Sequence, residues 1–157
     1  SIQGFEIGSE DIKIINKHYD ALYKTSYQIF LDHPIIGIGV KNFRITCGEK
    51  KYYSEGSCST HPHNTLLQFL SETGLSGTLF YLGFLIFCSF KLIIHFINMI
   101  FKRNDYVLKD YQVCLYACYI VMLWPLAPSL NFFNNWVSVL YFLPLPFLLM
   151  DTKKLYK

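Results

Sequence analysis

Apolar residues are distributed unevenly along the chain. Up to residue 73, polar and apolar positions alternate in short groups, whereas long apolar stretches follow from Gly74 onward. A helix that crosses a bilayer needs roughly 20 apolar residues, and three stretches approach that length, at about 74–101, 111–127 and 132–150. The pattern predicts an all-α polytopic membrane protein, in which a polar loop region (1–73) precedes about three transmembrane helices (74–157).

Two amphipathic helices are predicted within the polar region. Apolar positions in residues 14–31 recur at spacings of three, four and seven, and His33-Pro34 ends that pattern. A second, shorter helix is expected to begin at His61 or Pro62, because proline fits the first helical turn, and to stop at Gly74. In this second helix one face is apolar and the other mostly polar, as in helices that lie along a membrane surface: Leu66, Leu67 and Leu70 against Gln68, Ser71 and Glu72.

Composition agrees with a membrane protein. Hydrophobic residues make up 52% and charged residues 16% of the chain, against about a quarter charged in soluble domains. Residues 1–73 carry seven Lys/Arg and eight Asp/Glu, so the positive net charge of +3 arises in residues 74–157, where seven Lys/Arg stand against three Asp/Glu. These cations cluster at 102–109 and in the tail, which the positive-inside rule assigns to the cytoplasm. Residues 1–73 are then expected on the opposite side of the membrane from the cytoplasm, and nothing in this charge pattern indicates nucleic-acid binding.

Two cysteines bracket a hydrophilic, turn-rich insertion just before the histidines. Cys47 and Cys58 are expected to form a disulfide in an oxidising periplasm. Two free thiols would instead indicate a reducing compartment. A zinc site built from both cysteines with His61 and His63 is disfavoured, because the spacing lacks the usual close cysteine pair.

Cations follow a glycine-containing turn. Residues 35–40 lack the third glycine and the strand-helix context of a nucleotide loop, so a tight turn is expected there. Lys41 and Arg44 follow it, and an Arg side chain presents a planar fork suited to phosphate oxygens. Lys17 and His18 lie on the polar face of the helix at 14–31. That face is either simply solvated or part of a set that faces a diphosphate.

A spaced motif adds a family resemblance. His63-Asn64, nine residues, Gly74, two residues and Gly77 resemble the signature loop of the bacterial O-antigen ligase and O-antigen polymerase superfamily of membrane glycosyltransferases. Residues 32–43 are similar to a second conserved stretch of that family, and the resemblance covers roughly residues 19–81.

The resemblance implies a metal-independent transferase without cofactor, located in a bacterial inner membrane with residues 1–73 facing the periplasm. The donor would be a polyprenyl-diphosphate glycan and the acceptor the lipid A core, with the polymerase and the protein O-oligosaccharyltransferases as alternatives within the superfamily. His63, or failing that His61, would act as the base, although the residues alone leave a helix-capping role equally open for His63. Asn64 would orient the acceptor or cap the helix, and Gly74 and Gly77 would serve packing and helix termination. The diphosphate would be held by Arg44 with Lys41, Lys17 or His18; the family commonly has an arginine near position 18, which this chain lacks.

A non-catalytic transporter or assembly subunit is the alternative of another class. Lys91 and His95 lie inside the first long apolar stretch, and ionisable residues within a bilayer often mark a transport pathway. If the span begins at Gly74, Lys91 lies near its far end, where it can extend to the interface. Because the polar region starts at Ser1 with no apolar segment before it, we expect further spans upstream in a longer protein.

Overall fold

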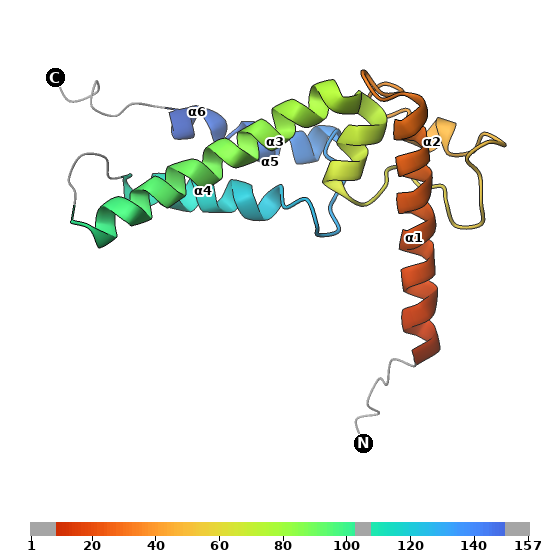
Figure 1. Ribbon diagram of the computed structural model, residues 1–157, viewed down its shortest axis with the longest axis horizontal. Coiled ribbons are helices and arrows are strands. Elements are labelled where there is room, and N and C mark those ends of the chain that lie inside the picture. The colour runs from red at the N-terminus through yellow and green to blue at the C-terminus, as the bar shows by residue number, and fades with distance from the viewer. Residues whose placement is uncertain (1–8, 103–107, 150–157) are drawn as a thin grey trace.

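The computed structural model describes residues 9–102 and 108–149, with side chains described for residues 19–102 and 108–148. These residues form helices and no strand, apart from an isolated bridge between Asn64 and Pro128, so the predicted all-α class is confirmed (Figure 1). The helices are α1 (Ser9–Asp32), α2 (Phe43–Thr46), α3 (Thr65–Ile100), α4 (Asp110–Met122), α5 (Asn135–Phe142) and α6 (Leu145–Leu149).

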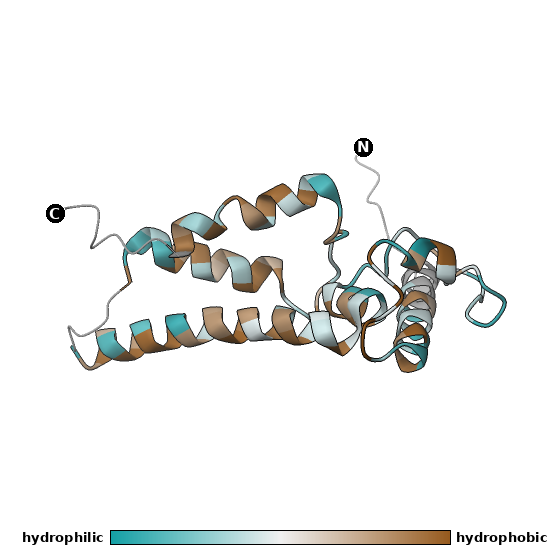
Figure 2. Cartoon of the chain, turned by 90° about the horizontal axis from the view of Figure 1, so that it is seen from above, coloured by the Kyte–Doolittle hydropathy of each residue, from teal (hydrophilic) through white to brown (hydrophobic). Residues whose placement is uncertain are grey.

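Helix α3 organises the molecule. Helix α1 packs across its N-terminal end and α4 lies alongside its remaining length, while α5 and α6 lie beyond α4 in the view from above (Figures 1 and 2). Its regular geometry is interrupted once, at Gly74 (φ 64°, ψ −161°), which divides it into a short arm, residues 65–73, and a long arm, residues 75–100. The predicted left-handed stop at Gly74 is therefore present, but a second helix continues directly from it.

The start of the short arm differs from the prediction. The helix begins at Thr65, because Asn64 is its N-cap and accepts a hydrogen bond from Leu67 N at 3.0 Å through its side-chain oxygen. The preceding residues cannot join the helix, since the main chain of His63 pairs instead with Ser129, whose N–H donates to His63 O at 2.9 Å.

The kink at Gly74 is stabilised by the segment at residues 34–39, which crosses it. Leu75 N and Ser76 N donate to Pro34 O and Ile35 O at 2.8 and 3.1 Å, and Ile38 N and Gly39 N donate to Ser71 O and Glu72 O at 3.0 and 2.9 Å. A Cβ atom at Gly74 would lie 2.5 Å from the main chain of Ile35, so a side chain cannot be accommodated there. Gly77 is likewise tightly packed, against Thr73, in agreement with the structural roles expected for both glycines.

The predicted set of three spans is not confirmed. Among the described residues, α3 is the one helix long and apolar enough to cross a membrane. Helix α4 ends at Met122, earlier than expected, and the third stretch forms two short helices, because a break falls at Leu143 and Pro144. Residues 103–107 and 150–157, on which the predicted orientation partly depended, lie outside the described residues.

Two cores form on either side of the kink. The first joins α1 to the disulfide-bonded segment through Leu22, Ile29, Phe43, Cys47 and Tyr52. The second lies between the long arm, α4 and α5–α6 and is dominated by aromatic rings. The long arm consists mostly of hydrophobic residues (Figure 2), and many of its large apolar side chains are exposed.

Candidate functional site

A polar cavity of about 510 Å³ lies where the loop region meets the turn between α4 and α5. It brings together three of the residues singled out in the sequence, Lys41, Arg44 and His61, which come from two separate segments. The remaining lining residues belong mainly to the α4–α5 turn and the start of α5: Thr60, Leu130, Asn131, Asn134, Asn135, Trp136 and Val137.

The two cations are presented by a tight turn, as predicted. Lys41 adopts a left-handed conformation (φ 65°), which reverses the chain directly before α2. Phe43 is fully buried beneath the turn, so Arg44 is directed outward. Lys41 Nζ donates to Asn135 Oδ1 at 3.0 Å, and this bond links the cation turn to the first residue of α5.

His61 is nearly buried, with 7% of its surface exposed. Its Nε2 lies 3.3 Å from Ser129 O, and its Nδ1 lies 3.0 Å from Thr60 Oγ1. Since a carbonyl oxygen only accepts, the contact assigns the proton to Nε2 and leaves Nδ1 to accept from Thr60. Burial, and secondarily the neighbouring His63, lower the pKa of His61, against the opposing effect of the Ser129 carbonyl. The ring is therefore neutral at pH 7.

His63 lies beside His61 but does not itself line the cavity. The two rings are 4.1 Å apart between centroids, and Tyr19 meets the His63 ring edge-on at 6.0 Å. His63 is partly exposed, and its Nε2 lies 3.2 Å from Ser59 Oγ. Its backbone is left-handed, with φ 57°, a conformation that L-residues adopt at a cost of roughly 1–2 kcal/mol.

Asn64 serves the fold. While its Oδ1 caps α3, its Nδ2 donates to Pro125 O at 2.9 Å, and the side chain is buried. Both ends of the amide are thus occupied within the protein. Of the two roles foreseen for Asn64, helix capping is confirmed, and the geometry leaves little room for contact with an acceptor.

The predicted disulfide is present. Cys47 and Cys58 are joined, with their Cα atoms 5.3 Å apart. The bond connects the end of α2, and with it the cation turn, to the segment that leads into His61. Because both thiols are consumed, a zinc site of these cysteines with His61 and His63 loses two of its four ligands, and within the described residues no group of three or more His, Cys, Asp or Glu side chains is placed to hold a metal ion.

Other residues noted in the sequence lie elsewhere. Lys17 and His18 belong to α1, but their side chains fall outside the described part, so their role stays a prediction. His95 is buried, and its Nδ1 accepts a hydrogen bond from Leu108 N at 3.1 Å, which anchors the segment before α4 to the long arm. Lys91 Nζ lies over the Phe87 ring, 5.5 Å from its centroid.

Sequence reasoning missed the contribution of the α4–α5 turn. Three asparagines of this turn and of the start of α5 line the cavity, and Ser129 contacts both histidines. The available signal was the density of uncharged amides between two apolar stretches: Asn131, Asn134 and Asn135.

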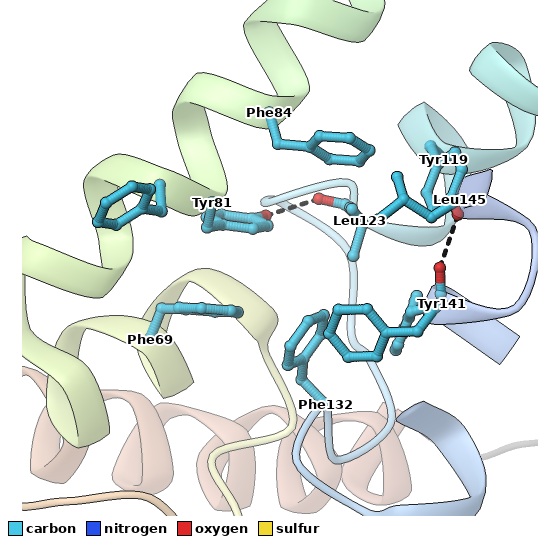
Figure 3. A pocket seen from close by; sticks show the side chains of 10 residues that line it. Phe69, Tyr81, Phe84, Tyr119, Leu123, Phe132, Tyr141 and Leu145 are labelled. Atoms are coloured by element: carbon cyan, nitrogen blue, oxygen red, sulfur yellow. Dashed lines mark hydrogen bonds between the residues drawn. The ribbon is translucent and has the colours of Figure 1, made fainter. Parts of the chain in front are cut away.

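A second cavity, of about 260 Å³, lies behind the same turn (Figure 3). Its walls are almost entirely aromatic, with rings from α3, α4, α5 and the turn. The tyrosine hydroxyls are directed at main-chain oxygens: Tyr81 donates to Leu123 O and Tyr119 to Tyr141 O, each at 2.6 Å. Phe132 lines this cavity while its neighbour Asn131 lines the polar one, so one short segment of chain separates the two.

Part of the chain is similar to a family of known proteins. Residues 19–82 match the family model described as O-antigen ligase, a range that includes the cation turn, the disulfide and the histidine segment. Searches of curated proteins and of solved structures gave no match. Residues 19–82 are thus similar to the O-antigen ligase family, which is consistent with a member of the O-antigen ligase superfamily and with the resemblance carried by the histidine-asparagine motif.

Proposed function

We propose that this chain acts as a membrane glycosyltransferase that moves a glycan from a polyprenyl-diphosphate donor to a hydroxyl of the lipid A core. The polar cavity carries the proposal, because it gathers two cations and a histidine inside the domain matched to O-antigen ligase. Such a transfer needs cations for the departing diphosphate and a base for the acceptor proton.

Lys41 and Arg44 are assigned to the diphosphate. Both line the polar cavity, and the N-terminus of α5, whose first residue Asn135 accepts from Lys41 Nζ at 3.0 Å, adds the positive end of a helix dipole beside them. The bond from Lys41 to Asn135 is exposed, so a phosphate oxygen would replace a neutral acceptor with a charged one, and charge-assisted bonds are the stronger.

The aromatic cavity is assigned to the first part of the prenyl chain. It lies on the other side of the turn that forms the wall of the polar cavity, and its lining is apolar. A lipid with a charged head and a hydrocarbon tail would place the head against Lys41 and Arg44 and the tail against the rings in Figure 3.

His63 is assigned as the base, with His61 beside it at the cavity wall. The partly exposed ring of His63 and its left-handed backbone support this role, because strained backbone conformations concentrate at functional sites. The His61 ring packs against the His63 ring, and because His61 is neutral it places no positive charge beside the base. His63 can then accept the proton of an acceptor hydroxyl that enters past His61.

Two alternative functions remain to be compared with the ligase: other transferases of the superfamily, and a transporter. The polymerase and the protein O-oligosaccharyltransferases would share donor and base and differ in the acceptor. The transporter alternative depended on Lys91 and His95, and it loses support because His95 is already held by the Leu108 main chain.

The test is complementation with the full-length protein in two bacterial hosts, one without its O-antigen ligase and one without its polymerase. The lipopolysaccharide ladder on a gel is the measurement. We expect rescue of the ligase-deficient host and a loss of transfer of about 100-fold or more for His63→Asn, the scale expected for a general base. Asparagine is chosen because it tolerates the left-handed backbone that His63 adopts.

Two further variants define the site. Arg44→Gln should reduce transfer strongly, and His33→Asn, which changes an exposed histidine at the end of α1, should leave it unchanged. Full activity of His63→Asn with loss in His61→Asn would move the base to His61. Rescue of neither host by a wild-type protein present in the membrane would contradict the ligase assignment.

A further inference from the structure

Gln68 and Glu72 lie one turn apart on the short arm of α3 and are almost completely buried, at 0% and 1% exposure. Neither lines the polar cavity. They nevertheless contact both segments that do: the cation turn before α2 and the α4–α5 turn. Polar side chains without access to water are costly unless every group has a partner, so these contacts determine what the two residues do.

Gln68 holds the α4–α5 turn. Phe132 N donates to Gln68 Oε1 at 3.0 Å, and a main-chain N–H can only donate, so this contact identifies the amide oxygen. The amide nitrogen therefore points the other way, where it donates to Asn131 Oδ1 at 2.8 Å and to Glu72 Oε2 at 3.2 Å. Asn131 Oδ1 also accepts from Phe133 N at 3.1 Å. The orientation of each amide is thus set by main-chain donors.

Glu72 holds the cation turn at two points. Its side-chain Oε1 accepts from Phe43 N at 3.2 Å, and its main-chain oxygen accepts from Gly39 N at 2.9 Å. These two donors bracket Lys41, and Arg44 directly follows Phe43. Since each of these partners is a donor, a residue that only accepts hydrogen bonds fits position 72.

We infer that Glu72 and Gln68 are positioning residues, which hold the Lys41–Arg44 turn and the turn at residues 131–135 at a fixed separation across the polar cavity. They touch no substrate and act through the segments that they hold. The inference rests on the proposed function only for the identity of the anion as a lipid diphosphate. The distance between the two turns sets how well any diphosphate fits between the cations and the asparagine amides.

A single-atom change tests the pairing. In Glu72→Gln, the new oxygen can still accept from Phe43 N, but the new NH₂ group then faces the NH₂ group of Gln68. Adding Gln68→Glu restores an acceptor opposite that donor and retains an acceptor for Phe132 N, at the expense of the Asn131 contact. The swapped pair should therefore recover much of what the single variant loses.

The matched control is Thr25 on α1. Thr25 is buried, its hydroxyl donates to Tyr52 O at 3.1 Å, and neither residue lines the polar cavity. Thr25→Val removes a buried hydrogen bond at nearly constant volume, so it should lower thermal stability as Glu72→Gln does while leaving the cavity unchanged.

Two measurements on purified full-length protein are needed: steady-state transfer with a lipid-diphosphate donor, and binding of inorganic pyrophosphate. For Glu72→Gln we expect about a tenfold higher KM for the donor and about tenfold weaker pyrophosphate binding, which corresponds to one mispaired buried group. The kcat value should change less, because the base is not displaced. The double variant should return both values toward wild type, and Thr25→Val should keep them.

Several results would overturn the inference. One is a Glu72→Gln protein, folded and present in normal amount, with wild-type KM and wild-type pyrophosphate affinity. Another is an equal rise of KM in Thr25→Val, which would reduce Glu72 to general stability, and a third is a loss confined to kcat. If wild type binds pyrophosphate in a manner sensitive to Glu72→Gln but transfers no glycan, the proposed function fails and the positioning role stands; wild type that binds no pyrophosphate removes the anion site itself.

Discussion

In the loop region, residues 19–73, most of the buried side chains are polar, whereas in the helical region, residues 74–148, they are mainly aromatic or aliphatic. The short arm of α3 alone buries Thr65, Gln68, Ser71 and Glu72, and all but the Thr65 hydroxyl make hydrogen bonds. The short arm also buries Phe69, and the long arm buries Tyr81, Leu85 and Cys88 with Thr78 and His95 as its buried polar side chains. The share of polar side chains in the interior thus falls from the short arm to the long arm of one helix.

The outer surfaces differ in the opposite sense. The long arm and α5 expose large apolar side chains, among them Phe80 at 83% and Trp136 at 85%, and carry a single charged residue, Lys91. The loop region exposes apolar side chains such as Ile35 and Ile36 together with the charged side chains of Lys24, Arg44 and Lys51. A hydrogen-bonded interior suits a site that must fix the direction of amides and cations. An apolar exterior suits a hydrocarbon solvent.

The largest expected effect tests that exterior with a matched pair of isoleucines. Ile86 on the long arm and Ile45 on α2 are equally exposed, at 68% and 67%. We expect Ile86→Asp to disfavour membrane insertion by about 3 kcal/mol, the cost of an aspartate near the centre of a membrane helix. Ile45→Asp should leave insertion unchanged. The fraction of full-length protein recovered in the membrane after alkaline extraction measures both.

Equal behaviour of the two variants would remove the distinction between the regions. If both stay in the membrane, the surface around Ile86 faces protein or water in the native state. If both are lost, the loop region is itself embedded.

The next effect concerns the cross-link that only the loop region has among the described residues. Replacing Cys47 and Cys58 together by serine should destabilise that region by about 3 kcal/mol, since the bond closes a short loop. Amide exchange should accelerate in residues 43–61 and remain unchanged in α4. Cys114→Ser, at an exposed free cysteine, is the control; faster exchange throughout the chain would show that the two regions unfold as one unit.

Features that depend on local chemistry were predicted well from the sequence. The His63-Asn64 motif, the disulfide, the stop at Gly74 and the cation turn after residues 35–40 could each be inferred from neighbouring residues. The length of the first apolar stretch likewise predicted the long arm of α3.

Long-range pairing could not be predicted. Gln68, Ser71 and Glu72 form the polar face of an amphipathic pattern, which is typical of contact with solvent, but the structure turns this face inward, against α1, the cation turn and the α4–α5 turn. Nothing local indicates that Phe43 N and Phe132 N are the donors that satisfy these groups. For the same reason, the sequence could not show that His61 and not His63 lines the cavity, because the position of the His61 ring depends on its contact with Ser129, 68 residues away.

The smallest expected effect is a pH dependence that arises in the loop region. His61 has a pKa below its ordinary value of 6.5 because it is buried and lies beside His63. As pH falls below about 6.5, the unfolded chain takes up this proton before the folded protein does, so the folded state loses stability. Asp32 acts in a separate, lower window, because Lys51 and Tyr52 hold its pKa below 3.8, and stability that it contributes is lost only near that pH and below. Urea unfolding of the loop region between about pH 7.5 and 5 should therefore show a decline that His61→Gln removes. If the free energy of unfolding of His61→Gln declined by the same amount between these pH values, the proton would be taken up by another group. The buried, neutral ring of His61 would then not be the source of the pH dependence of the loop region.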